Sequence, residues 1–173
     1  MNERIEKIFC LVERTFDAFD LIACERAVII TINERPTYTN FFDLINIYSN
    51  DFTVTAIANT DIYFDHDGVR LIEENIQSGE CYALTRWDVL PNSTAKHFIR
   101  ADSQDCWVFK GKIKKVLDCN FTMGRPACDN KIAYLLEAVG YKILNPSKDI
   151  RTYHLHNSNI RNYNAAKGSP DRL

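Results

Sequence analysis

Short runs of β-branched and aromatic residues recur along the chain and predict β-strands. These runs cover residues 5–12, 27–32, 52–58, 81–87, 106–109 and 141–144. They are spread over most of the sequence, so the strands are expected to belong to the same folded unit.

Apolar residues recur at helical spacing between these runs. Residues 41–48 share a broad apolar face, with Thr37 or Thr39 available as the N-cap. Residues 69–76 present a second apolar face, with Asp67 as the expected cap. Two helices are therefore predicted in the first half of the chain.

The clearest helix is predicted over residues 129–139, where a stripe of four apolar side chains ends at Gly140. Strands that alternate with helices favour an α/β domain with a mostly parallel central sheet flanked by helices. In such sheets ligands gather at the carboxyl ends of the strands. We expect one domain over residues 1–164 and a flexible polar tail over residues 165–173.

Composition narrows the class of protein. A chain of 173 residues with 46% hydrophobic content suits one domain with a substantial core. The net charge of -2 provides no positive field to attract nucleic acid, so no nucleic-acid partner is expected. No apolar run approaches the ~18 residues of a membrane helix. With six scattered cysteines and no secretory leader pattern, we expect a soluble, cytoplasmic protein without a transmembrane segment.

The segment that follows the strand at 52–58 contains the first candidate site. Asn59 and Asp61 are two positions apart, so in an extended segment their side chains point the same way. A carboxylate and an amide oxygen placed together can hold Mg²⁺ or Mn²⁺, with a substrate diphosphate completing the coordination. The alternative is that both side chains only make turn hydrogen bonds.

Five ordered segments resemble GT-A fold glycosyltransferases, and most closely an uncharacterised bacterial and large-virus group with that fold. They are ANTDIYFD at 58–65, ALTRWD at 83–88, DSQDCWVFK at 102–110, CDN at 128–130 and TYHLH at 152–156. The resemblance spans roughly residues 35–163. It implies a GT-A-like, Rossmann-like domain whose first strand and helix are short or missing here.

The resemblance also implies a function. Members transfer a sugar from a nucleotide-diphosphate donor to an acceptor hydroxyl, on a glycan or another molecule, with Mn²⁺ or Mg²⁺ bound by a D-x-D-like motif. Asn59 and Asp61 occupy the positions of that motif. Asp129 resembles the general base of inverting members, so inversion is favoured. Without the resemblance, Asp129 at a helix start reads as an N-cap.

Other residues are candidates for substrate or metal contacts. Asp105 competes with Asp129 for the role of base and shares a strand face with Trp107, which can pack on a sugar; the alternative is a polar strand entry with a core tryptophan. Arg86 and Trp87 can contact donor or acceptor. The alternative is that Arg86 pairs with Asp88 or another neighbouring acid beside a buried Trp87.

Two further segments complete the candidate set. His154 and His156 lie two positions apart, and one of them, preferably His154, can be the last metal ligand; a structural pair is the alternative. Arg35 and Tyr38 precede or begin a helix where a phosphate can bind, although the same residues suit a simple helix entry.

A second function stays open beside the glycosyltransferase. Asn59 in place of an acid and the short amino-terminal part favour a catalytically silent domain that binds sugar or nucleotide, or acts as a scaffold. Nucleotidyl transfer requires a Gly-rich phosphate loop, and the sequence has none. The identity of the sugar and the oligomeric state are not specified by these patterns.

Overall fold

The computed structural model describes residues 3–14 and 24–155. Its helices are α1 (Tyr38–Tyr48), α2 (His66–Asn75) and α3 (Cys128–Ala138). Its strands are β1 (Ile8–Glu13), β2 (Ala27–Ile32), β3 (Val54–Ala58), β4 (Ile62–Phe64), β5 (Glu80–Leu84), β6 (Arg86–Val89), β7 (Ala95–His97), β8 (Cys106–Lys110), β9 (Lys142–Leu144) and β10 (Thr152–His154). The predicted helices and six strand regions are confirmed, although one predicted strand is divided. His156 and the predicted tail lie outside the described residues.

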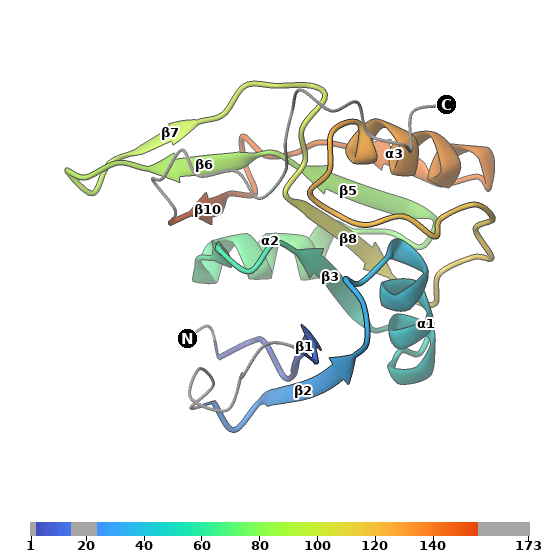
Figure 1. Cartoon of the computed structure of the whole chain (residues 1–173). Coiled ribbons are helices and arrows are strands. Elements are labelled where there is room, and N and C mark those ends of the chain that lie inside the picture. Colours follow the sequence, from blue (N-terminus) through green and yellow to red (C-terminus); the bar gives the residue numbers. More distant parts are fainter. Residues whose placement is uncertain (1–2, 15–23, 156–173) are drawn as a thin grey trace.

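The strands form three sheets, and the predicted mostly parallel central sheet is wrong (Figure 1). The central sheet has the order β3-β8-β5-β9, in which β8 runs antiparallel to both neighbours and β9 runs parallel to β5. A parallel neighbour needs a crossover connection such as a helix. Between β5 and β8 the chain makes the β6-β7 hairpin instead, and it returns antiparallel.

A second sheet has the order β4-β10-β6-β7, and only its β10-β6 pair is parallel. The predicted strand at 81–87 is divided at Thr85, where the chain passes from the central sheet to the second one. The Thr85 side chain is buried and lies 2.7 Å from Ser147 Oγ and 2.9 Å from His97 Nε2. This crossing places β6 beside β10.

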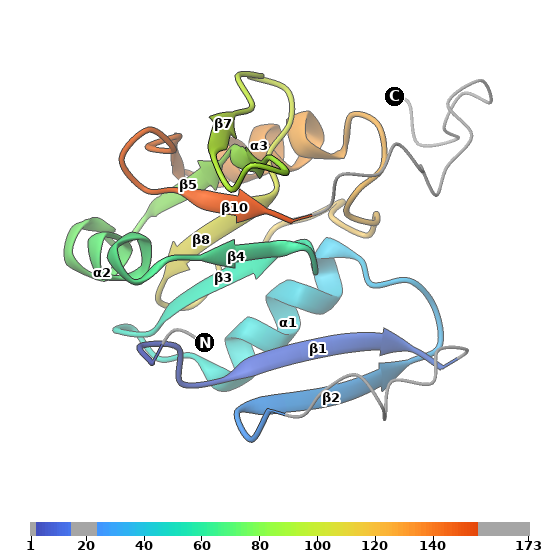
Figure 2. The same ribbon diagram turned by 90° about the vertical axis from the view of Figure 1, so that its left-hand side faces the viewer.

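Strands β1 and β2 form a separate parallel pair that lies alongside α1 (Figure 2). The ring of Phe9 in β1 is 4.6 Å from the ring of Tyr48 in α1. Before α1, this pair is the only strand structure in the described residues, and it does not pair with the central sheet.

The helix starts depend on different residues. Thr37 caps α1, as predicted: Asn40 N donates to Thr37 Oγ1, and Thr37 N donates to Asn40 Oδ1. Helix α2 is capped by Asp65, whose Oδ1 accepts from Gly68 N at 2.6 Å, and the predicted cap Asp67 is wrong.

Both faces of the central sheet are covered. On one face α1 and α3 bury Phe42, Trp107 and Ile132 among the core residues, and on the other α2 packs against Leu84 and Val108. The carboxyl end of β3 and the amino end of β8 lie side by side at the edge of these layers, next to the second sheet. Among the helices of the described residues, none has the length and apolar character needed to cross a membrane.

Candidate functional site

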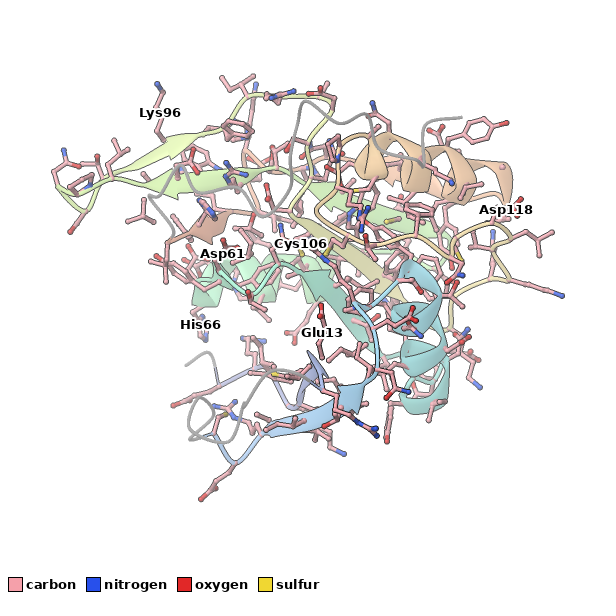
Figure 3. The ribbon with its side chains drawn as sticks, in the orientation of Figure 1. Glu13, Asp61, His66, Lys96, Cys106 and Asp118 are labelled. Atoms are coloured by element: carbon pink, nitrogen blue, oxygen red, sulfur yellow. The ribbon has the colours of Figure 1, made fainter. Side chains whose placement is uncertain are left out.

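Asn59 and Asp61 lie in the turn between β3 and β4. The turn is closed by Ile62 N donating to Asn59 O at 3.2 Å. The side chains have separate partners: Asn59 Nδ2 donates to Asp105 Oδ1 at 3.1 Å, whereas Asp61 Oδ2 lies 3.1 Å from His154 Nε2. Asp61 lies beside β10 in Figure 3, because Leu155 N donates to Asp61 O at 3.1 Å. The two side chains therefore face different partners and lie at opposite ends of a larger polar cluster.

His154 joins two carboxylates that are distant in sequence. Its Nε2 faces Asp61, 93 residues away, and its Nδ1 lies 3.0 Å from Asp88 Oδ1. The β10-β6 pairing sets this geometry, since His154 and Asp88 are direct partners in the register. The His154 side chain is only 13% exposed.

The ring of His154 leaves one nitrogen available to a cation. A neutral imidazole has one N–H, so it can donate to only one of its two carboxylate neighbours. The other ring nitrogen then presents a lone pair to a carboxylate oxygen, which is repulsive. A cation between Nε2 and Asp61 removes this repulsion.

Arg86 continues the cluster from Asp88 to Asp105. Its Nε donates to Asp88 Oδ1 at 2.7 Å, and its Nη1 lies 3.2 Å from both carboxylate oxygens of Asp105. The guanidinium also lies 4.2 Å above the ring of Phe98. Burial lowers the pKa of Arg86, but the carboxylates of Asp105 and Asp88 together raise this pKa by more, so the net shift is upward. Arg86 is thus a fixed cation.

Asp105 is the most enclosed acid of the cluster, with a side chain 8% exposed. Burial raises the pKa of Asp105, while Arg86 and Asn59 oppose that shift. Both of its oxygens are occupied by Arg86, and one also accepts from Asn59. These contacts join β3, β6 and β8. Because both carboxylate oxygens of Asp105 are engaged in them, Asp105 is less suited than Asp129 to exchange a proton with a substrate.

Asp129 lies in the first turn of α3 and is not its cap. The N-cap position is Ala127, at φ 67, and no side chain caps this helix. Asp129 Oδ2 instead accepts from Gln104 N at 3.3 Å, and Oδ1 accepts from Cys128 Sγ at 3.4 Å. Burial raises the pKa of Asp129 to about 6, with Asp105 and Asp102 adding to the shift and the two hydrogen bonds opposing it. A carboxylate with this pKa is suited to accept a proton near neutral pH.

We give the name carboxylate network to the set Asn59, Asp61, Arg86, Asp88, Asp105, Asp129 and His154. Asp129 belongs to it through the backbone N–H of Gln104, the residue before Asp105, and through the electrostatic effect of Asp105 on its pKa. The network contains four carboxylates against one guanidinium and one imidazole. This excess of negative charge favours binding of a cation.

The network fits a divalent cation only in part. Within residues 3–14 and 24–155, no group of three or more His, Cys, Asp or Glu side chains is placed to hold a metal ion. Asp61 and His154 supply two donors 3.1 Å apart, and adjacent ligands of an octahedral Mg²⁺ site are about 3.0 Å apart. Oxygen atoms of a bound diphosphate and water have to complete the coordination.

The other predicted residues lie outside the network. Tyr38 and Trp107 are fully buried in the core, where they have no surface to offer a substrate. Trp87 Nε1 donates to Ser147 O at 2.7 Å, and its ring stacks on His97 at 4.9 Å. Arg35 is exposed, and its guanidinium lies close to Gly124 in the loop before α3.

The structure gives two residues a part that sequence reasoning did not assign. Asp88 orients His154, and Gln104 supplies the backbone N–H that binds Asp129. The sequence suggested Asp88 only as a partner of Arg86, a contact that the structure contains. The backbone contact of Gln104 has no sequence signal.

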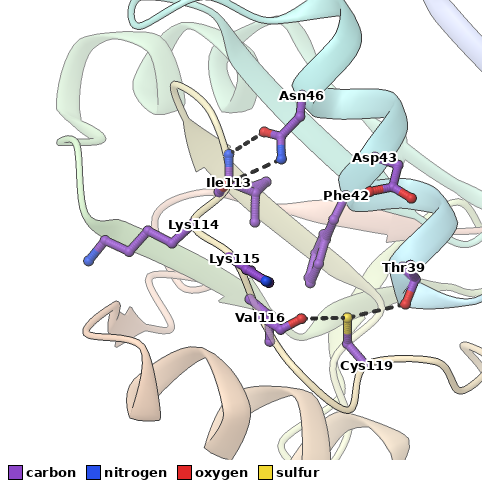
Figure 4. Close-up of a pocket in the computed structure, with 9 residues that line it drawn as sticks. All are labelled: Thr39, Phe42, Asp43, Asn46, Ile113, Lys114, Lys115, Val116 and Cys119. Carbon is purple, nitrogen blue, oxygen red and sulfur yellow. Dashed lines mark hydrogen bonds between the residues drawn. The ribbon is translucent and has the colours of Figure 1, made fainter.

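A cavity of about 230 Å³ lies between α1 and residues 113–119, separate from the network (Figure 4). Its lining is tied together by hydrogen bonds: Asn46 exchanges two with Ile113, and Cys119 Sγ contacts both Thr39 and Val116. The nearby Lys114 ammonium donates to Gly140 O at 2.8 Å. These contacts fasten the loop to α1 and give this cavity a structural role.

Comparisons with protein-family models, curated proteins and solved structures each gave no match. The function is therefore inferred from the residues of the carboxylate network and from the resemblance of the five sequence segments.

Proposed function

We propose that this protein is a metal-dependent glycosyltransferase that moves a sugar from a nucleotide-diphosphate donor to an acceptor hydroxyl. One observation carries the proposal. The five segments that resemble GT-A glycosyltransferases, far apart in sequence, each contribute a side chain to the carboxylate network. An active site is expected to bring such distant segments together, whereas a scaffold does not require it.

The donor diphosphate needs positive charge, because negative charge builds on it as the sugar leaves. Asp61 and His154 Nε2 are the residues that would hold Mn²⁺ or Mg²⁺. When bound, the ion supplies Lewis-acid stabilisation of the departing diphosphate. Asp88 holds His154 in the orientation that directs Nε2 toward Asp61.

Asp129 is the residue proposed to accept the proton. The acceptor oxygen attacks the anomeric carbon and its O–H proton passes to the Asp129 carboxylate. The bond from that carbon to the diphosphate oxygen breaks, and the nucleotide diphosphate leaves with the electron pair. A base with a pKa of about 6 is ionised at neutral pH and still takes up a proton readily.

A silent sugar-binding or nucleotide-binding domain is the second candidate, and Asn59 favours it. The amide Nδ2 of Asn59 is committed to Asp105, so only its Oδ1 is available to a cation. The network then offers fewer anionic ligands than a motif with two acids. Binding without turnover is the result that this candidate predicts.

The test is release of free nucleotide from a panel of nucleotide sugars, with and without Mn²⁺. The proposal predicts Mn²⁺-dependent release that Asp61→Asn abolishes. Asp118→Asn is the matched control, since Asp118 is exposed, lies outside the network and has φ 57, a conformation that Asn adopts well. Thermal stabilisation by a donor without release would support the silent domain, and no response to any donor would contradict both candidates.

A further inference from the structure

The pair β1-β2 has an open edge on the side of β2. Figure 2 shows β1 between α1 and β2, so β2 is the outer strand of the pair. Among the described residues, β2 pairs with β1 and with no other strand. Parallel strands usually belong to larger sheets, and a sheet usually needs three or more strands to be stable by itself. Strand β2 is therefore in a position to accept a further strand.

The hydrogen bonds to β1 decide which backbone groups of β2 point outward. Ile8 N donates to Arg26 O at 3.0 Å, and Arg14 N donates to Ile32 O at 2.8 Å. In a parallel pair, alternate residues turn both backbone groups toward the neighbouring strand, so the even-numbered residues of β2 face β1. The N–H and C=O groups of Ile29 and Thr31 then point away from β1, and no strand of the described residues lies there to receive them.

The outer edge of β2 lacks the features that normally prevent strand pairing. Natural edge strands are often very short, or carry lysine, proline or a bulge. Strand β2 has six residues, AVIITI, and contains neither a charged residue nor a proline. Val28 and Ile29 are each 37% exposed. An apolar, uncharged edge of this kind is a template for an added strand.

The charges around β2 are complementary to themselves. The stretch ERAVIITINER at 25–35 begins and ends with Glu-Arg. When two copies of β2 are paired antiparallel about Ile30, Arg26 of each copy lies opposite Glu34 of the other. The same register sets Ile29 opposite Thr31, so that their outward N–H and C=O groups bond across the pair. Registers shifted by two residues keep these backbone bonds but do not place Arg26 opposite Glu34.

We propose that β2 pairs antiparallel with β2 of a second copy of this chain, which gives a two-fold symmetric dimer with a four-stranded sheet. The two-fold axis makes each Arg26–Glu34 contact occur twice. Val28, Ile30 and Ile32 of one copy then lie beside the same residues of the other, on one face of the sheet. The contact uses no residue of the carboxylate network, so it does not depend on the proposed function.

The experiment is sedimentation velocity of the full chain over roughly 1–200 μM, because an interface of one strand from each copy is small and its Kd is expected to be micromolar. The mass of the wild type should rise with concentration toward twice that of the monomer. Hydrogen exchange followed by NMR locates the contact. The amide protons of Ile29 and Thr31 should become protected as the dimer forms, whereas those of Val28 and Ile30 are protected by β1 at every concentration.

Charge reversal tests the register. Glu34→Arg sets two arginines opposite each other and Arg26→Glu sets two glutamates, so each variant alone should dimerise at least roughly tenfold more weakly. Mixed in equal amounts, the two variants should form a heterodimer with wild-type affinity, because every contact again joins opposite charges. Glu137→Arg makes the same change as Glu34→Arg at an exposed position of α3 and should dimerise like the wild type.

A second variant keeps the test valid if Arg26→Glu lowers the melting temperature strongly. Arg26 Nη1 donates to Ile5 O at 2.6 Å, and this bond is lost in that variant. Thr31→Pro then replaces it, because proline removes an outward N–H of an edge strand and leaves the bonds of the even-numbered residues to β1 in place. Thr31→Pro should weaken the dimer at least roughly tenfold, since a backbone bond is lost on both sides of the axis.

The outcomes decide the proposal. A monomeric mass over the whole concentration range overturns it, and so does protection of Ile29 and Thr31 that appears only when an extended peptide of another protein is added. A dimer that Glu34→Arg and Thr31→Pro leave unchanged also overturns it, because the contact then lies elsewhere. A concentration-dependent dimer that the charge variants weaken singly and restore as a mixture supports it, whether or not any nucleotide sugar is turned over.

Discussion

Replacement of Asp129 by Asn tests whether this carboxylate is a buried acid or an ordinary helix cap. A cap that accepts backbone N–H bonds in its charged form stabilises the helix, and its loss lowers stability by ~1 kcal/mol. Asp129 instead has a pKa raised from 3.8 to about 6, chiefly by burial. Ionised Asp129 therefore opposes folding, and neutral Asn removes that opposition.

The magnitude follows from the shift. At about 1.36 kcal/mol per pKa unit, a rise from 3.8 to about 6 corresponds to about 3 kcal/mol. Below pH 3.8 the carboxyl is protonated in both states and contributes no penalty. As the pH rises through 6 the penalty becomes complete: it is about 1.5 kcal/mol at pH 5 and about 3 kcal/mol at pH 8.

The assay is urea unfolding of wild type, Asp129→Asn and the exposed control Asp118→Asn at pH 5 and pH 8. The free energy of unfolding of Asp129→Asn, relative to wild type, should increase by about 1.5 kcal/mol between the two pH values. The relative stability of Asp118→Asn should stay constant. A pH-independent difference for Asp129→Asn, or a larger loss at pH 8 than at pH 5, would refute a buried acid with a raised pKa.

Three further predictions concern the network and the core. Asp88→Asn should weaken Mn²⁺ binding roughly 10–100-fold by releasing His154, measured by calorimetry; unchanged affinity would contradict the orienting role. Asn59→Asp should lower the free energy of unfolding at pH 8 by about 1–3 kcal/mol, because a donor to Asp105 becomes a like charge; equal stability in urea would argue against that contact. Leu136→Ala should cost about 2–5 kcal/mol by thermal or urea unfolding, since Leu136 is fully buried in α3, and a loss below 1 kcal/mol would contradict that packing.

The local elements could be predicted because they depend on local spacing. Apolar residues at helical spacing identified α1, α2 and α3, and Thr37 was a correct choice of cap for α1. Strand direction could not be predicted in this way. Alternation along a strand indicates which residues share a face, but it does not indicate which strand is the neighbour or which way it runs.

The division of residues 81–87 illustrates the same point. The run is continuously apolar and aromatic up to Thr85, so it reads as one strand. The break at Thr85 depends on Ser147 and His97, which are distant in sequence. Only contacts of this kind decide that Arg86 and Asp88 belong to the second sheet.

The candidate site was predicted in part. The sequence identified Asp61, Arg86, Asp105, Asp129 and His154, which the structure brings into one network. Side-chain burial was the part that the pattern could not supply. An aromatic residue on an alternating strand can face a ligand or the core, and Trp107 faces the core.

The central claim is that Asp61 and His154 hold a divalent cation together with a diphosphate. Calorimetric titration of Mn²⁺ into the full chain with a nucleoside diphosphate present measures this directly, for wild type, Asp61→Asn and the control Asp118→Asn. We predict saturable Mn²⁺ binding that Asp61→Asn abolishes and Asp118→Asn retains. Equal Mn²⁺ affinity in wild type and Asp61→Asn would contradict the claim.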